Sequence, residues 1–185
     1  MHRAGHFGVS LFTVAVLTIP LDITIGVPLA IIMIGTEPLP DYDMQIDAID
    51  HRGYSHTFAG AAAVAIALSG VAGGITFLIT EQVTTAPASV GIASYLDYIP
   101  SSFAVITLTF IGTILGFTAH FLADMITVGE GYFGIQPFAP VSDWESSIQL
   151  CRADNSAWNS ALLSLGMLTL IGSGYVQYRL LTGGF

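Results

Sequence analysis

The sequence contains no lysine and only one cysteine, Cys151. Its basic residues are four arginines, set against 13 acidic residues, and the formal net charge is −9. A chain of this charge is not expected to offer a basic surface to nucleic acid. A single cysteine can form neither an internal disulfide framework nor a cluster of thiolate metal ligands, so we interpret Cys151 as a small, partly buried residue.

Charge of either sign is scarce, whereas hydrophobic sequence is abundant. Charged residues make up 9% of the chain, against roughly 25% in soluble domains. Hydrophobic residues make up 53%, and the mean hydropathy is +0.73. These values indicate an integral membrane protein. We predict an all-α, polytopic bundle of about four to five membrane helices, folded as one membrane-embedded domain over residues 1–185.

Four apolar segments are candidates for membrane-crossing helices: residues 7–35, 57–80, 103–128 and 159–181. A crossing helix needs roughly 20 residues, each rising about 1.5 Å, and the last three segments meet this length directly. Two pairs of glycines four residues apart, Gly70 with Gly74 and Gly112 with Gly116, would let helices approach one another closely.

The first apolar segment is interrupted by Pro20 and Asp22. Proline kinks or breaks a helix, and an aspartate in mid-bilayer costs on the order of 3 kcal/mol. The segment is therefore either one kinked span or a hairpin of two short helices, residues 7–19 and 22–35, whose turn must be satisfied by surrounding protein. A cleaved signal peptide is a third interpretation, because Arg3 precedes the apolar stretch, but no small-residue cleavage site follows.

The positions of the arginines favour the hairpin. Arginines that flank membrane spans prefer the cytoplasm. With a hairpin, Arg3, Arg52 and Arg152 all lie on the cytoplasmic side, and Arg179 is the exception. The loop 81–102 holds neither arginine nor lysine, as expected of an external loop. We therefore predict a multi-pass protein of the inner (cytoplasmic) membrane.

Side chains able to ligate a metal fall into a few short motifs. In GFTAHFLADMIT, His120 and Asp124 are four residues apart and project from the same face of a helix. Imidazole and carboxylate together suit zinc, manganese and similar divalent ions. The alternative is a structural hydrogen bond between helices. The membrane setting favours the metal-binding interpretation over the structural one, because ionisable residues within membranes are rare and costly.

The segment HRGYSHT carries His51 and His56, five residues apart. On a continuous helix they would diverge by about 140°, so they converge only if a turn lies between them. Gly53 permits such a turn, and Ser55 is expected to cap the helix that begins near His56.

Upstream of that segment, LPDYD places Asp41 and Asp43 two residues apart, so both face the same way in extended backbone. With a hairpin, these aspartates, His6 and the end of the third apolar segment share one membrane face. A single kinked span would move His6 to the opposite face. Each residue taken alone is also explained as an interfacial polar side chain. The predicted cluster comprises His6, Asp41, Asp43, His51, His56, His120 and Asp124.

Together these motifs resemble a known family. The Gly-His pair near the N-terminus, LPDYD, HRGYSHT, GFTAHFLADMIT and GIQPFAPVS are similar to the motifs of the YdjM-type membrane-bound metal-dependent hydrolases, which are also described as LexA-binding, inner-membrane-associated hydrolases. The likeness runs from His6 to Ser142. Gly5 replaces a threonine, Tyr42 replaces an isoleucine, and YSHT replaces a Thr-His-Ser ending, but every ligand-type side chain is kept.

The resemblance implies a divalent metal, zinc or else manganese, in one or more copies. The implied metal-site residues are His6, Asp41, His51, His56, His120 and Asp124. Asp43 and Arg52 belong to the same motifs, and we predict catalytic roles for both. The arrangement is more remotely similar to zinc-dependent phospholipase C and single-strand nuclease folds.

The leading hypothesis is a metal-dependent hydrolase that acts on a phosphoester or lipid-like substrate at the cytoplasmic membrane surface. A bound ion lowers the pKa of a water from about 16 toward about 7. Asp43 or Asp124 could accept its proton. Arg52 could hold a phosphate through its planar fork, or it could serve only as a topological charge.

Two other functional classes stay open. The protein could be a metal-ion or proton-coupled transporter, although transporter sites usually lie near the bilayer midplane and these motifs gather at one surface. It could also be a non-catalytic adaptor that holds a LexA-like regulator at the membrane, as the family description suggests. The loop 129–157, with Trp144 and several acids, is the segment most suited to a partner surface.

Overall fold

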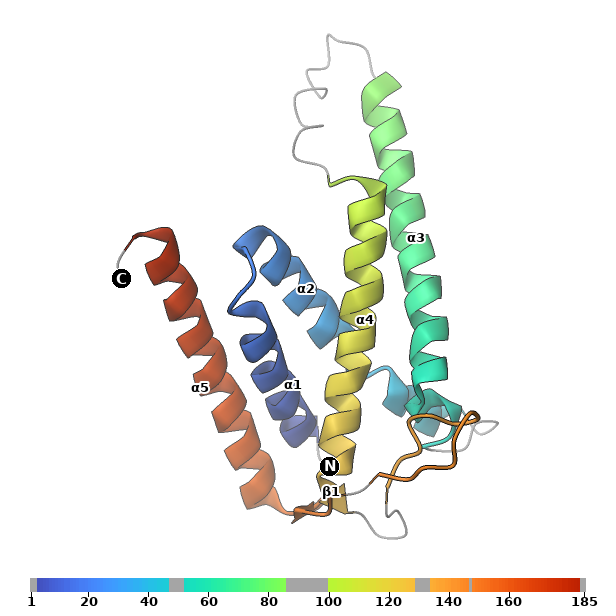
Figure 1. Ribbon diagram of the computed structural model, residues 1–185, viewed down its shortest axis with the longest axis vertical. Helices are drawn as coiled ribbons and strands as arrows, with labels where there is room; N and C mark the ends of the chain where they lie inside the picture. Colours follow the sequence, from blue (N-terminus) through green and yellow to red (C-terminus); the bar gives the residue numbers. More distant parts are fainter. Residues whose placement is uncertain (1–2, 47–51, 86–99, 129–133, 147, 184–185) are drawn as a thin grey trace.

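The computed structural model describes residues 3–46, 52–85, 100–128, 134–146 and 148–183. The described chain is mostly helical and has almost no strand, which confirms the predicted all-α architecture (Figure 1). Its elements are α1 (Arg3–Thr18), α2 (Ile23–Thr36), the short 3-10 helices η1 (Pro40–Gln45) and η2 (Tyr54–His56), α3 (Phe58–Thr85), α4 (Ser102–Met125), the strands β1 (Thr127–Val128) and β2 (Cys151–Arg152), and α5 (Ser156–Leu181).

Four segments are long and apolar enough to cross a membrane. By length and composition they are Ile23–Gln45, Phe58–Thr84, Ser102–Met125 and Ser156–Leu181. The outward faces of α3 and α5 are covered with exposed large apolar side chains, such as Ile75 and Leu168. Such surfaces suit lipid rather than water, so the structure supports the prediction of a multi-pass membrane protein.

The first apolar region is a hairpin, as the arginine pattern predicted. The helices α1 and α2 run in opposite directions and meet at a turn over residues 19–22 (Figure 1). Asp22 ends the turn as the N-cap of α2, where its side chain accepts from the backbone N–H of Thr24 at 2.8 Å. With 16 and 14 residues, the two helices are only about 24 and 21 Å long, short of the roughly 30 Å hydrocarbon core.

A glutamine from α5 satisfies the backbone of this turn. Gln177 Nε2 lies 3.0, 2.8 and 2.9 Å from the carbonyl oxygens of Thr18, Ile19 and Leu21, to which it can donate. Backbone carbonyls at membrane depth need a partner from the protein because lipid provides none. Gln177 therefore supplies the protein surround that the hairpin interpretation required.

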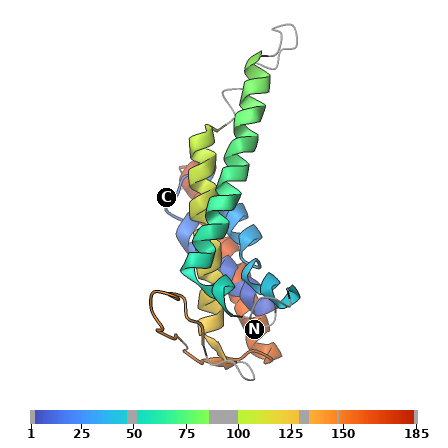
Figure 2. The ribbon, with the colours of Figure 1, turned by 90° about the vertical axis from the view of Figure 1, so that its right-hand side faces the viewer.

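The helices α1 and α2 and the helix α3 all pack on α4, and α5 packs on α1 (Figures 1 and 2). Close approach of α1 and α5 depends on Gly8, where a Cβ would collide with the backbone of Leu162. Gly112 and Gly116 of α4 contact α2, as their spacing predicted. The same prediction for Gly70 and Gly74 is wrong, because a Cβ at either glycine would meet open space within 4 Å.

This packing brings three chain segments to one end of the bundle. The start of α1, the short helices η1 and η2, and the end of α4 lie together there (Figures 1 and 2). Described residues that follow α4 are held at the same end, because β1 pairs with β2 and the backbone N–H of Phe58 donates to the carbonyl of Pro137 at 2.8 Å. Polar side chains are buried at this end.

Candidate metal centre

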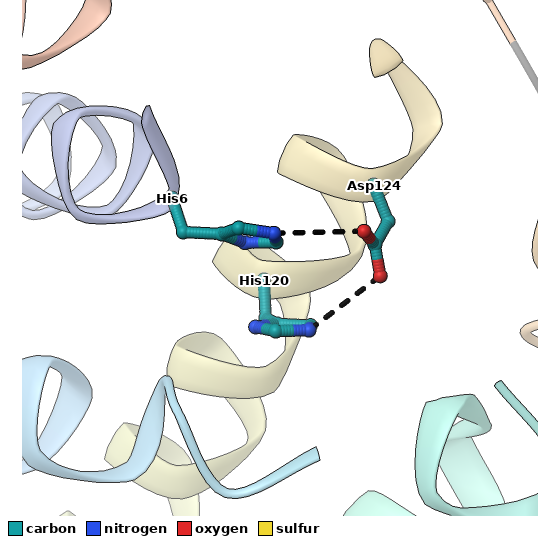
Figure 3. Close-up of side chains that lie close together, drawn as sticks. All are labelled: His6, His120 and Asp124. Atoms are coloured by element: carbon teal, nitrogen blue, oxygen red, sulfur yellow. Dashed lines mark ion pairs between the residues drawn. The ribbon is translucent and has the colours of Figure 1, made fainter. Parts of the chain in front are cut away.

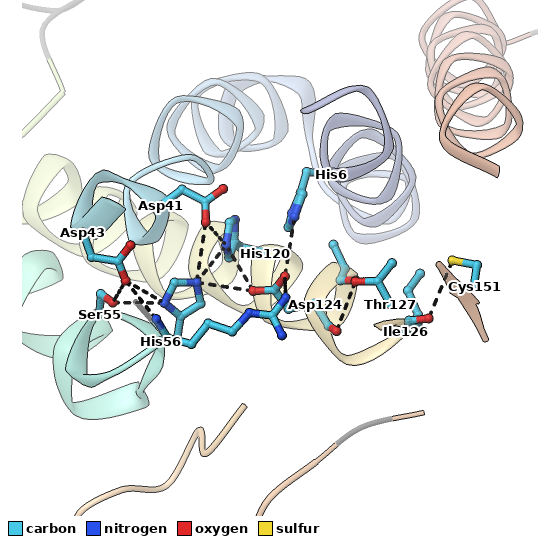
Figure 4. A network of polar contacts seen from close by, with 12 residues as sticks. His6, Asp41, Asp43, Ser55, His56, His120, Asp124, Ile126, Thr127 and Cys151 are labelled. Carbon is cyan, nitrogen blue, oxygen red and sulfur yellow. Dashed lines mark hydrogen bonds and ion pairs between the residues drawn. The ribbon is translucent and has the colours of Figure 1, made fainter. Parts of the chain in front are cut away.

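Four elements contribute side chains to the buried polar cluster. His6 comes from the first turn of α1, Asp41 and Asp43 come from η1, and His56 ends η2. His120 and Asp124 come from the last turns of α4 (Figure 4). The structure thus brings together six of the seven predicted cluster residues. The seventh, His51, lies outside the described residues.

The α4 pair faces the cluster as its spacing predicted. His120 Nε2 lies 3.5 Å from Asp124 Oδ2, and both residues are buried (Figure 3). His6 approaches from α1 and stacks on His120, with ring centroids 4.4 Å apart. Its Nε2 lies 3.6 Å from Asp124 Oδ1. His6 reaches this position because the hairpin returns the start of α1 to the end of α4.

Four ligand-type atoms lie close to one another between η1, η2 and α4. His56 Nε2 lies 3.3 Å from both His120 Nε2 and Asp124 Oδ2. Asp41 Oδ1 lies 3.4 Å from His120 Nε2 and 3.7 Å from His56 Nε2. With the His120–Asp124 contact at 3.5 Å, five separations among these four atoms fall between 3.3 and 3.7 Å.

These separations fit a shared cation better than a hydrogen-bond network. Most hydrogen bonds between such groups have heavy-atom distances of about 2.7–3.2 Å. Ligands about 2.0–2.1 Å from one tetrahedral zinc ion lie roughly 3.3–3.4 Å from one another. Moreover, Asp124 Oδ2 is buried without a hydrogen-bond partner among the described residues. The residues present therefore fit a divalent ion with nitrogen and oxygen ligands.

Further carboxylates hold the far side of each imidazole. Glu37 Oε1 lies 3.3 Å from Nδ1 of His120 and 3.5 Å from Nδ1 of His6. Asp43 Oδ2 lies 3.3 Å from Nδ1 of His56 (Figure 4). A carboxylate at Nδ1 keeps the proton on that nitrogen and leaves Nε2 to bind a metal. Asp43 therefore occupies an orienting position behind His56, and the catalytic role predicted for it stays a prediction.

Glu37 is the site residue that sequence reasoning missed. It directly follows α2, is buried, and lies four residues before Asp41. The signal available was an acidic side chain at the end of an apolar segment and just before LPDYD. Burying an unpaired charge at the end of an apolar segment costs free energy. The sequence therefore predicts that Glu37 has a buried partner, but it does not identify that partner.

Arg52 is held against the cluster in an unusual backbone conformation. Its φ is 63°, in the left-handed region, which costs a non-glycine residue roughly 1–2 kcal/mol. Its backbone N–H donates to Asp43 Oδ2 at 3.1 Å, and its Nη2 donates to Asp124 Oδ1 at 2.8 Å. Both contacts hold carboxylates of the cluster in place, so the structure favours a positioning role for Arg52.

The local structure around His56 differs from one sequence-based expectation. Ser55 was expected to cap the following helix, but Thr57 does so, because its Oγ1 accepts from the backbone N–H of Gly60 at 3.0 Å. The Ser55 hydroxyl instead donates to Asp43. The reason is that α3 begins at Phe58, so Thr57 stands in the N-cap position and Ser55 comes too early in the chain to fill it.

His56 and Cys151, which lie outside the membrane-crossing segments, have shifted pKa values. Burial lowers the pKa of His56, but its contacts with the carboxylates of Asp124 and Asp41 outweigh burial, so its pKa is raised from the ordinary value. Burial also raises the pKa of Cys151, whose Sγ contacts the carbonyl of Ile126 just beyond the end of α4, away from His56 (Figure 4). The Cys151 thiol is thus neutral and separate from the cluster.

Comparison with known proteins agrees with the motifs. The model of the family described as YdjM inner membrane protein matches residues 1–182. No curated protein and no solved structure matches the chain.

Proposed function

The chain belongs to the YdjM inner membrane protein family, and on that premise we propose that it is a membrane-bound, metal-dependent hydrolase of a phosphoester. The observation that carries the proposal is the arrangement of Asp41, His56, His120 and Asp124, among whose ligand atoms five separations lie between 3.3 and 3.7 Å. Carboxylates behind the imidazoles leave the Nε2 atoms to the ion. His6 extends the ligand set toward α1.

His56, His120 and Asp124 would suffice to hold a divalent cation, zinc or manganese, which leaves Asp41 free of the ion and one coordination position for a water. The cation would activate that water and polarise the scissile group. The chain's own residues then handle the proton. Asp41 has the most exposed side chain of the four, at 31%, and one of its oxygens points away from the imidazoles (Figure 4). That oxygen is the best placed to accept a proton from the attacking water. The water oxygen bonds to phosphorus as the P–O bond to the leaving group breaks, and the leaving oxygen takes up a proton.

The charge pattern supports a cytoplasmic location for this site. Arg3, Arg52 and Arg152 belong to the site end of the bundle, whereas Arg179 belongs to the opposite end of α5. Arginines near span ends prefer the cytoplasm. The position of the cluster at one end of the bundle also supports a hydrolase over a transporter, whose site would be expected near the midplane.

Metal content and hydrolysis, measured on the same purified samples, test the proposal. Wild-type protein is expected to carry zinc or manganese and to cleave phosphomonoester or phosphodiester substrates. His120→Ala should lose both, while Thr113→Ser, two turns earlier on α4, should keep both. Metal-free wild-type protein, or hydrolysis unchanged in His120→Ala, would contradict the proposal.

The two other functional classes would give different results in experiments on the same purified protein. Metal uptake into proteoliposomes without hydrolysis would indicate a transporter. Capture of a LexA-like regulator that survives loss of the metal ligands would indicate an adaptor.

A further inference from the structure

We propose that a cavity beside the metal cluster binds a phosphorylated lipid and that Arg3 holds its phosphate. This inference rests on the proposed function and names the substrate class of the same site. The cavity has a volume of about 550 Å³, within the range of roughly 300–1,000 Å³ typical of ligand sites. Three residues of the cluster line it: His6, Glu37 and Asp41.

The first turn of α1 carries both Arg3, which would bind the phosphate, and His6, a residue of the metal cluster. Arg3 and His6 are three residues apart and therefore lie on the same face of the helix, and both line the cavity. A guanidinium offers paired N–H donors that match two phosphate oxygens. A phosphate held by Arg3 would therefore be presented to the side of the cluster that contains His6 and Asp41.

Arg52, the arginine predicted to hold the phosphate, has a different setting. Its Nη2 is 2.8 Å from Asp124 Oδ1, and its side chain is only 8% exposed. Arg3 is exposed. Among the described residues, it is the arginine that lines the cavity. The structure therefore assigns substrate recognition to Arg3 and leaves Arg52 to position Asp124.

Much of the remaining wall of the cavity is apolar, with Gln45 as a polar member. Phe7, Tyr42 and Met44 line it and are 42%, 52% and 61% exposed. Phe7 lies one turn after Arg3, where α1 enters its apolar run. A small ionic phosphate would gain nothing from this surface, whereas an acyl chain would bury it and continue along α1 into the bilayer. A phosphate headgroup with an attached hydrocarbon chain matches both parts of the wall.

The carboxylates in the cavity make this binding depend on the metal. Glu37 and Asp41 carry negative charge at the place where the phosphate would sit, and like charges repel strongly away from water. A divalent cation in the cluster reverses that local charge. Phosphate binding is therefore expected in metal-loaded protein and not in protein stripped of metal.

The experiment measures binding to the full-length, metal-loaded protein in detergent. The probe is a short-chain diacylglycerol phosphonate, in which a CH₂ group replaces the oxygen of the scissile P–O bond, so that it binds without being cleaved. Methylphosphonate serves as the soluble probe without acyl chains. The variants are Arg3→Gln, Arg3→Lys and Phe7→Ala, with Arg179→Gln at the opposite end of the bundle as the matched control.

Arg3→Gln is expected to weaken binding of the lipid phosphonate about tenfold. For the corresponding cleavable lipid phosphate ester, the variant should raise KM while kcat stays within about threefold. Arg3→Lys should recover part of the affinity because it keeps the charge without the fork. Phe7→Ala should weaken the lipid probe but not methylphosphonate. The metal-to-protein ratio should be unchanged in all variants, and Arg179→Gln should bind like wild type.

The outcomes separate this inference from the proposed function. Metal-dependent binding that is equal in wild type and Arg3→Gln would overturn the role of Arg3 and leave the hydrolase intact. Equal affinity for the lipid phosphonate and methylphosphonate would overturn the claim that the ligand is a lipid, and it would indicate a soluble phosphate ester. Wild-type protein that takes up no metal would overturn the proposed function itself.

Discussion

Glu37 and His120 meet through a buried contact of 3.3 Å between Oε1 and Nδ1. The two residues are 83 positions apart in the sequence, and each comes from the site end of its own helix, α2 or α4. The contact turns His120 so that its Nε2 faces Asp41, His56 and Asp124. Metal binding at this site would depend on such orienting contacts as well as on the ligands themselves.

Glu37→Gln should weaken metal binding without removing a ligand. The amide keeps the shape of the side chain but loses the charge beside Nδ1 of His120 and of His6. Loss of such an orienting carboxylate typically reduces metal affinity by about 10–100-fold. Competition with a chromophoric chelator measures the change. Glu81→Gln, an exposed glutamate on α3, is the control, and equal affinity in the two variants would contradict the orienting role.

Arg52→Gln should destabilise the protein and disturb Asp124. Removing one partner of a buried ion pair costs about 3–5 kcal/mol, because the other charge is left buried. Thermal unfolding in detergent should show the loss, and a bound divalent ion should reduce it by compensating Asp124. Arg52→Lys keeps the charge and should be intermediate. Unchanged stability in Arg52→Gln, with or without metal, would show that Asp124 does not need this partner.

Gln177→Leu should weaken the α1–α2 hairpin while sparing the metal site. The substitution removes the donor shared by three turn carbonyls, and burying an unsatisfied polar group costs about 1–3 kcal/mol. We expect a lower midpoint of thermal unfolding and an unchanged metal-to-protein ratio. Thr169→Ala, at a half-buried position on the same helix, provides the comparison. A variant as stable as that control would mean that lipid or water satisfies the turn.

His56 should make metal-stripped protein more stable in mild acid than in base. Its pKa is raised because contacts with Asp124 and Asp41 outweigh burial, so the folded state holds this proton more tightly than the unfolded chain. The resulting stabilisation is fully present below about pH 6.5 and is lost as the pH rises through the raised pKa. The unfolding midpoint after EDTA treatment, followed from pH 6 upward, checks this.

His56→Asn should flatten that pH dependence. Metal affinity should change in the opposite direction, rising with pH, because the ion competes with the proton for His56. A midpoint for the stripped protein that rises steadily with pH would contradict the assigned shift.

The sequence predicts the helices and most of the cluster because both depend on local patterns. Long apolar segments predict spans, and the i, i+4 spacing places His120 and Asp124 on one face. The positive φ lies at Arg52 and not at Gly53, and the Ser55 hydroxyl donates to Asp43. These features depend on Asp43 and Asp124, which arrive from other elements, so no local pattern could predict them. Glu37 was missed for the same reason.

X-ray absorption at the metal edge tests the central claim most directly. Protein loaded with zinc is expected to show nitrogen and oxygen ligands at about 2.0–2.1 Å, with the outer-shell scattering of imidazole and no sulfur at about 2.3 Å. His120→Ala should lose part of the imidazole signal or the ion itself. A sulfur ligand, a spectrum without imidazole, or a spectrum unchanged in His120→Ala would contradict the assignment of the metal to this cluster.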